Sequence, residues 1–239
     1  PPDDPDRLSQ ITTLWSVVHR AHGLQTATAQ QAKEQLLARY GVAIRRYLVG
    51  ALRDETAADD VYQNFALNFL EGKLASASQD RGNFRGFLKT VLYRSVADHF
   101  RRGSRDRLSQ PADEDFAQHD DGSATDTAFD ASWRDTLLTR TWDALSAVES
   151  ETGRPLFTVL RLRVEQPEAS SAELAEELST ALGRKITSTH LRVWLHRARE
   201  RFAALLLSEI RQSLDGGERD AIEQELSDLQ LLDYCRPAL

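Results

Sequence analysis

Residues 170–210 read SSAELAEELSTALGRKITSTHLRVWLHRARERFAALLLSEI, and they are the most informative stretch of the chain. A short run rich in small residues, 172–182, is followed by a turn at Gly183 and by a longer run that begins near Thr187 or Ser188. A short support helix, a turn and a long basic helix together predict a helix-turn-helix, the motif whose second helix enters the major groove of DNA.

The longer run has one apolar and one basic side. Its apolar residues recur every three or four positions, as they do on the buried side of a helix: Leu191, Leu195, Ala198, Phe202 and Leu205. The side chains left facing outward are mostly positive: Arg192, His196, Arg197, Arg199 and Arg201. Trp194 is expected in the core rather than in contact with DNA.

A second basic stretch occupies residues 81–102, RGNFRGFLKTVLYRSVADHFRR. Six of its positions are Arg or Lys and only Asp98 opposes them, although the whole chain has a formal net charge of -7. Its apolar spacing predicts a helix with Phe84, Phe87, Leu88, Val91, Leu92 and Val96 on the buried side. We expect Phe100 in the core as well, whereas the pattern leaves Tyr93 open between core packing and base stacking.

The remaining segments also read as helices, so we predict an all-α fold. One helix is expected around Trp15 and another over 29–52. The stretch 54–72, DETAADDVYQNFALNFLEG, opens with acidic residues and closes on Gly72, which is a helix start and stop signature. Two more helices are expected in 133–148 and 155–164, and no segment alternates as a strand does.

A change of composition divides the chain into two helical domains. Residues 111–131, PADEDFAQHDDGSATDTAFDA, hold seven acidic side chains and no Lys or Arg, which predicts a flexible linker. We therefore expect a first domain over 8–103, an acidic linker over 104–131 and a second domain over 132–214. An acidic C-terminal helical extension, 215–239, follows a break at Gly216–Gly217.

Composition excludes several classes of protein. The chain is 41% hydrophobic and 28% charged, and no apolar run approaches the length of a bilayer span, so we expect no membrane partner. The single cysteine, Cys235, excludes an internal disulfide, and we therefore expect a cytoplasmic protein. The histidines lack zinc-site spacing, and no phosphate-binding loop or serine elbow occurs, so we expect no metal, no cofactor and no catalytic residue.

Several motifs in this order resemble a known family. AADDVYQNFALNFLEG (57–72) is similar to the polymerase-docking helix of bacterial sigma factors, and residues 81–102 resemble the promoter-melting helix that follows it. ELAEELSTALGRKITSTHLRVWLHRARERF (173–202) resembles their terminal helix-turn-helix. The short two-domain layout resembles the extracytoplasmic-function (ECF) group, in a divergent branch often associated with Ser/Thr kinases.

The resemblance implies partners and site residues. Core RNA polymerase would be bound through its β′ coiled coil and β flap, with the acidic helix contributing Asp59, Asp60, Gln63 and Asn64. The −10 region of promoter DNA would meet Asn83, Arg85, Lys89, Tyr93, Arg94, His99, Arg101 and Arg102. The −35 region would meet Ser188, Thr189, His190, Arg192, Val193 and Arg197. An anti-sigma protein or a Ser/Thr kinase would be the regulatory partner.

Simpler interpretations of the same residues stay open. Asp59 and Asp60 also suit the first turn of any helix, and a basic helix end also complements the helix dipole. The acidic linker also suits a solubilising spacer. A two-domain helical DNA-binding regulator that never contacts RNA polymerase is the main alternative, and an enzyme is the weaker one.

Overall fold

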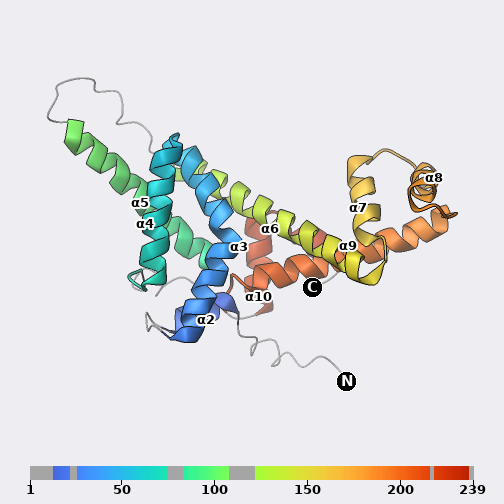
Figure 1. Ribbon diagram of the computed structural model, residues 1–239, viewed down its shortest axis with the longest axis horizontal. Helices are drawn as coiled ribbons and strands as arrows, with labels where there is room; N and C mark the ends of the chain where they lie inside the picture. The colour runs from blue at the N-terminus through green and yellow to red at the C-terminus, as the bar shows by residue number, and fades with distance from the viewer. Residues whose placement is uncertain (1–12, 22–25, 75–82, 108–121, 216–217, 237–239) are drawn as a thin grey trace. The chain divides into compact units, whose positions relative to one another are not determined.

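The computed structural model describes residues 13–21, 26–74, 83–107, 122–215 and 218–236 (Figure 1). Within these ranges the secondary structure is helical and no strand forms, so the prediction of an all-α fold is confirmed. The helices are α2 (Leu14–Arg20), α3 (Ala27–Leu52), α4 (Glu55–Leu70), α5 (Phe84–Arg107), α6 (Gly122–Thr152), α7 (Leu156–Glu165), α8 (Ser171–Leu182), α9 (Ser188–Arg211), α10 (Arg219–Asp228) and α11 (Leu232–Cys235).

Two compact units divide the chain in a way that differs from the predicted domains. The first unit combines the described residues of 1–136 with those of 211–225, and the second combines 137–210 with those of 226–239. One division therefore falls inside α6 and another inside α10, and residues 211–225 belong to the first unit although α9 belongs mostly to the second. Sequence order alone suggests contiguous domains, because hydrophobic periodicity reports which residues are buried but not which partner buries them.

The first unit is built around aromatic side chains from several helices. Trp15 of α2 lies 5.1 Å, centroid to centroid, from the rings of both Phe84 and Phe87 of α5. Phe69 of α4 approaches the same two rings at 5.7 and 5.8 Å. Tyr40 of α3 joins this cluster through Phe84 at 5.9 Å. These aromatic contacts connect α2, α3, α4 and α5 and fix which side of α5 is buried.

Part of the segment that was predicted to be a flexible linker belongs to helix α6. It begins at Gly122, and its Phe129 and Trp133 are 2% and 0% exposed within the first unit. Trp133 stacks on Tyr40 at 4.3 Å, and the Ser132 hydroxyl donates to the Ala43 carbonyl at 3.2 Å. The prediction of a flexible segment is therefore wrong for 122–131, because two aromatic residues four positions apart bury enough apolar surface to hold the acidic helix. Residues 108–121 lie outside the described residues, and 104–107 close α5.

The segment after α9 is hydrogen-bonded into the first unit. The backbone N–H groups of Trp15 and Phe84 donate to the carbonyls of Gln212 and Ser213, at 3.2 and 2.7 Å. The Thr13 hydroxyl donates to the Leu214 carbonyl at 2.5 Å. These carbonyls follow the last residue of α9 and have no helical partner, so the bonds satisfy groups that burial would otherwise leave unpaired. The predicted C-terminal extension is thus two short helices, α10 and α11, and its first part belongs to the first unit.

In the second unit, α7, α8 and α9 share an apolar core. Val159 of α7 packs with Leu174 and Leu178 of α8, and α9 contributes Leu191 and Leu195. A neighbouring cluster joins α6, α7 and α9 through Leu145, Leu156, Leu160 and Ala198. This arrangement supports α8 and α9 from behind and leaves the opposite side of α9 exposed. Within the described residues no helix is both long and apolar enough to cross a membrane.

Candidate nucleic-acid interface

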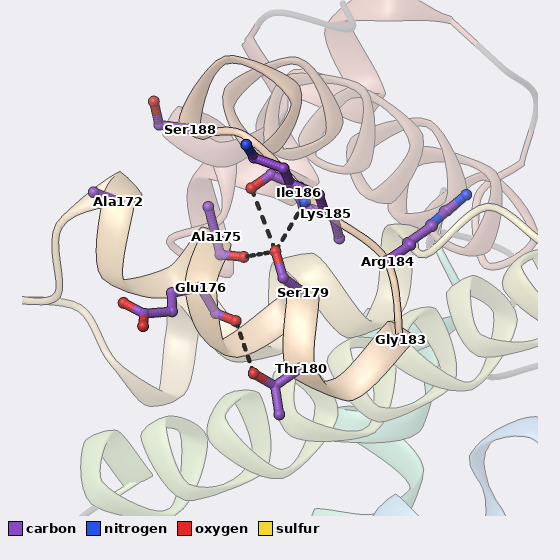
Figure 2. A pocket seen from close by; sticks show the side chains of 10 residues that line it. All are labelled: Ala172, Ala175, Glu176, Ser179, Thr180, Gly183, Arg184, Lys185, Ile186 and Ser188. Atoms are coloured by element: carbon purple, nitrogen blue, oxygen red, sulfur yellow. Dashed lines mark hydrogen bonds between the residues drawn. The ribbon is translucent and has the colours of Figure 1, made fainter.

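Short-range hydrogen bonds determine the geometry of the helix-turn-helix. Ser170 caps α8 in a reciprocal capping box with Glu173, and Gly183 ends α8 with a positive φ of 62°. The Ser179 hydroxyl donates to the Ala175 carbonyl at 2.6 Å and accepts the N–H of Ile186 at 2.8 Å (Figure 2). Ile186 is buried, so the turn is held both by this hydroxyl and by its own apolar anchor.

The start of α9 agrees with the sequence prediction. The helix begins at Ser188, and the Thr187 hydroxyl accepts the N–H of His190 at 3.3 Å as an N-terminal cap. Leu191, Leu195 and Ala198 are buried, which fixes the rotation of the helix. The residues expected at the −35 region therefore lie at the surface. Ser188 is partly buried, and the other five are exposed: Thr189, His190, Arg192, Val193 and Arg197.

The exposed side of this motif is strongly positive. Four arginines of α9 are exposed, and the acidic residue among them, Glu200, lies 3.4 Å from the imidazole of His196. Arg184 and Lys185 add two more exposed cations in the turn, which the sequence analysis did not single out. These two side chains help to line a shallow hollow of about 600 Å³ between α8 and the start of α9 (Figure 2). Clustered cations around a helix-turn-helix suit a polyanion, because phosphate neutralisation dominates nucleic-acid affinity.

The C-terminal half of α5 presents aromatic and basic side chains together. Tyr93 and Phe100 are 52% and 50% exposed and, seven residues apart, lie on one side of the helix. The expectation that Phe100 lies in the core is therefore wrong, since the apolar side of α5 turns away after Leu92. Arg94 and Arg102 are exposed, and the rings of His99 and Phe100 meet edge to face at 5.8 Å.

Arg101, also expected at the −10 region, forms an ion pair within its own helix. Its guanidinium donates to Asp98 three positions earlier, and both side chains are exposed to a large degree. The hydrogen bond from Arg101 holds the pKa of Asp98 below its ordinary value. An exposed pair of this kind is weak and exchanges readily for another anion, so Arg101 stays available to a phosphate.

The N-terminal end of α5 is different, because carboxylates of its own unit occupy it. Arg85 is buried, and its Nε and Nη2 donate to the two oxygens of Glu225 at 2.7 and 2.9 Å, while Nη1 donates to Asp130 at 2.6 Å. Asn83 donates to Glu225 at 3.0 Å and accepts the N–H of Gly86 at 2.6 Å. Lys89 donates to Asp130 at 2.7 Å. Three of the residues expected at DNA thus hold α10 and α6 against α5.

These side chains form one cluster, the Arg85 cluster: Asn83, Arg85, Lys89, Asp130 and Glu225. Its two positive and two negative charges balance. Burial by itself lowers the pKa of the Arg85 guanidinium, but the hydrogen bonds and charges of Glu225 and Asp130 more than offset this and raise the pKa above its ordinary value. Glu225 is only 1% exposed. Sequence reasoning missed the cluster because Glu225 lies 140 positions from Arg85, in a segment that reads as a separate acidic tail.

Helix α4 carries an exposed polar stripe, the α4 stripe, made of Asp60, Gln63, Asn64 and Leu67. These positions are spaced as neighbours on one helix face, opposite the buried Ala58, Phe65 and Phe69. The Asn64 amide donates to the Asp60 carbonyl at 2.9 Å. Leu67 is 58% exposed and was missed by the sequence analysis, although its place three residues after Asn64 is a usable signal.

Asp59 is the member of the expected docking set that the structure places elsewhere. Its two carboxylate oxygens accept from Nε and Nη2 of Arg45 on α3, at 2.6 and 3.1 Å. This hydrogen bonding holds the pKa of Asp59 below its ordinary value. The pair joins α3 to α4, so Asp59 has a structural partner, whereas Asp60 faces solvent.

Comparison with known proteins finds no relative of this chain. No protein-family model, no curated protein and no solved structure matches the chain. Within the described residues, no group of three or more His, Cys, Asp or Glu side chains is arranged to hold a metal ion. Any functional conclusion therefore rests on the surfaces of α4, α5 and α9 themselves.

Proposed function

We propose that this chain is an ECF-type sigma factor, a cytoplasmic protein that binds bacterial core RNA polymerase and directs it to promoters. One observation carries the proposal: a capped helix-turn-helix with an exposed arginine-rich side occurs in the same chain as a helix that exposes aromatic and basic side chains together. The first suits the major groove of a duplex, and the second suits unpaired bases. Reading both forms of DNA is what promoter opening requires.

Each surface has a distinct part in the proposed mechanism. The second unit binds the −35 region through the exposed side of α9 and contacts the β flap. The C-terminal half of α5 receives bases of the −10 region as the strands separate. Loss of a base-reading contact on α9 should cost about 1–3 kcal/mol at one DNA position, whereas loss of a phosphate contact should weaken all sequences alike.

The α4 stripe supplies the proposed contact with the β′ coiled coil of the polymerase. Asp60, Gln63 and Asn64 are exposed polar groups, and Leu67 is an apolar side chain among them. Such a patch, with one apolar anchor and a polar surround, is suited to a protein partner. Asp59, bound to Arg45, contributes indirectly by joining α4 to α3.

The Arg85 cluster favours a second candidate function. Because Asn83, Arg85 and Lys89 bond to carboxylates of their own unit, fewer side chains of α5 are left for DNA than the resemblance to sigma factors implies. A helical DNA-binding regulator that uses α9 alone, without RNA polymerase, is consistent with that arrangement. The enzyme alternative has no comparable support.

Transcription in vitro tests the proposal. Core RNA polymerase and fragmented genomic DNA from the organism that carries this chain are incubated with and without the protein, and the 5′ ends of the RNA are sequenced. New start sites preceded by a shared two-part motif are the expected result. DNA binding without any new start site would support the regulator instead.

Matched variants then test the docking surface. The double variant Asp60→Ala, Gln63→Ala should abolish new start sites and core polymerase binding while duplex DNA binding is retained. The control is Gln31→Ala, Glu34→Ala, an exposed pair on α3 that has the same spacing and loses the same two kinds of side chain, one carboxylate and one amide. A control that loses polymerase binding as strongly as the α4 variant would show that α4 has no special part in docking.

A further inference from the structure

Trp194 occupies an unusual place on the exposed side of the helix-turn-helix. Its indole packs in part against the buried cluster that contains Leu191 and Leu195, so one portion of the ring is anchored in the core. The rest of the ring is accessible, since the side chain is partly exposed. A rigid aromatic ring is thus fixed at the boundary between the core and the basic surface. The interpretation of Trp194 as a purely core residue is therefore incomplete.

Two surface side chains are arranged against this ring. The guanidinium carbon of Arg184, in the turn before α9, lies 5.4 Å from the Trp194 ring centroid. The imidazole of His190, one helical turn earlier on α9, stacks on Trp194 with a centroid distance of 6.5 Å and an interplanar angle of 23°. A guanidinium over an indole face is attracted by the ring, and its N–H donors still point outward around its rim.

Arg184 has no carboxylate partner among the described residues that could account for its orientation. It is exposed, and no ion pair to it is formed within the described ranges. Glu176, the acidic side chain lining the same hollow, lies on the opposite side of it from Arg184 in Figure 2. The indole of Trp194 is therefore positioned to restrict a charged side chain that would otherwise sample many rotamers.

We propose that Trp194 is a positioning residue that holds the Arg184 guanidinium ready for a DNA backbone phosphate beside the major-groove site of α9. This inference rests on the proposed function, because it needs α9 to bind duplex DNA. A phosphate is the suitable ligand because Arg184 lies in the turn, outside the recognition helix whose first residues reach base edges. Pre-ordering the side chain lowers the entropy lost on binding, so the contact strengthens without any change in charge.

The test measures binding of the full chain to a short mixed-sequence DNA duplex, by fluorescence anisotropy over a series of salt concentrations. Arg184→Ala should weaken binding about 3- to 10-fold at low salt and reduce the slope of log affinity against log salt by about 0.9, as expected for one lost phosphate. Arg184→Lys, which keeps the charge but cannot stack as a planar group, should keep the slope and still weaken binding. Arg184→Lys binding as tightly as the wild type would overturn the proposal.

A double-mutant cycle separates positioning from a structural effect of Trp194. Trp194→Leu should weaken binding in the wild-type background but have little further effect once Arg184 is Ala, and Trp194→Phe should recover part of the loss. Equal losses from Trp194→Leu in both backgrounds would overturn the proposal. The matched control is Arg161→Ala on α7, since Arg161 also lies over a ring, that of Phe157 at 5.8 Å, but outside the proposed interface; it should change neither affinity nor slope.

The outcomes also distinguish this inference from the proposed function. Arg197→Ala, on the exposed side of α9, should weaken duplex binding whether or not Trp194 positions Arg184. If Arg197→Ala weakens binding but the cycle shows no coupling, only the positioning role fails. If the wild-type chain has no salt-dependent affinity for the duplex, both the role of α9 and the positioning role fail.

Discussion

Removing the Glu225 carboxylate should destabilise the first unit more than substitution of any single exposed residue. Glu225 is 1% exposed and accepts three hydrogen bonds, two from Arg85 and one from Asn83. In Glu225→Ala, the buried Arg85 keeps Asp130 as its partner, but Lys89 also draws on that carboxylate. Breaking a buried pair costs about 3–5 kcal/mol, and because Asp130 remains, we expect a cost at the lower end, about 3 kcal/mol.

The assay must report on the first unit alone, because two compact units need not unfold together. We would follow amide hydrogen exchange of peptides from α5 over a urea series, using mass spectrometry. Glu225→Ala should lower the free energy of unfolding seen by these peptides by about 3 kcal/mol. The control on the same helix is Glu223→Ala, which breaks an exposed pair with Arg219 and should cost no more than about 0.5 kcal/mol.

A second variant tests the cause of the effect. Arg85→Met combined with Glu225→Leu removes both charges and keeps apolar volume, so it should be considerably more stable than Glu225→Ala. Loss of the main partner of the buried Arg85 guanidinium is not the cause if Glu225→Ala costs less than about 1 kcal/mol, the range of an exposed pair. The same conclusion holds if the double variant is as unstable as the single one, since that variant has no buried charge left to compensate.

Three single residues offer further tests. Gly41→Ala should destabilise the chain, because a new Cβ would lie 2.6 Å from the Tyr62 hydroxyl. In a Tyr62→Phe background, which lacks this hydroxyl, the same change should stabilise α3 by about 0.5–1 kcal/mol. Urea unfolding of the wild type, the two single variants and the double variant checks both results. Gly183→Ala should lower the free energy of unfolding by about 1 kcal/mol, because φ of Gly183 is +62°. The control Gly50→Ala, which has open space around the new Cβ, should not lower it. Thermal unfolding of both variants checks this. Burial raises the pKa of the Cys235 thiol to about 11 from 9.0. Below pH 9 the thiol is protonated in both the folded and the unfolded chain, so its burial costs no deprotonation. As the pH rises from 9 towards 11, the unfolded chain loses this proton first and the folded state loses stability. At pH 8 iodoacetamide should label Cys235 roughly 100-fold more slowly than in urea, and equal rates would contradict this.

Much of the helix-turn-helix could be predicted because its determinants are local. Gly183 permits the left-handed turn, Thr187 caps α9, and Leu191 and Leu195 set the rotation of the helix. All of these signals lie within a few residues of the elements they specify, so periodicity and capping rules are sufficient. The same reason explains why Asp60, Gln63 and Asn64 were expected on the exposed side of α4, whereas the pairing of Asp59 with Arg45 depends on α3 and was not foreseen.

The structure of the predicted linker and the partners of the N-terminal end of α5 could not be predicted in the same way. The acidic composition of 111–131 describes its solubility, but Phe129 and Trp133 are buried by residues more than 80 positions away, among them Tyr40 and Tyr47. Likewise, a basic run shows which side chains are charged but not which carboxylates they meet. Long-range packing decides both, and a single sequence carries no direct record of it.

Residue spacing was therefore sufficient for the all-α class, the order of the helices and the exposed side of α9, because each depends on a pattern within one helix. Tertiary packing was needed to show that Arg85 is buried against Glu225 while Tyr93 and Phe100 remain exposed on the same helix. The physical reason is that a charge on a helix surface has no fixed role until a partner from elsewhere in the chain either neutralises and buries it or leaves it to solvent.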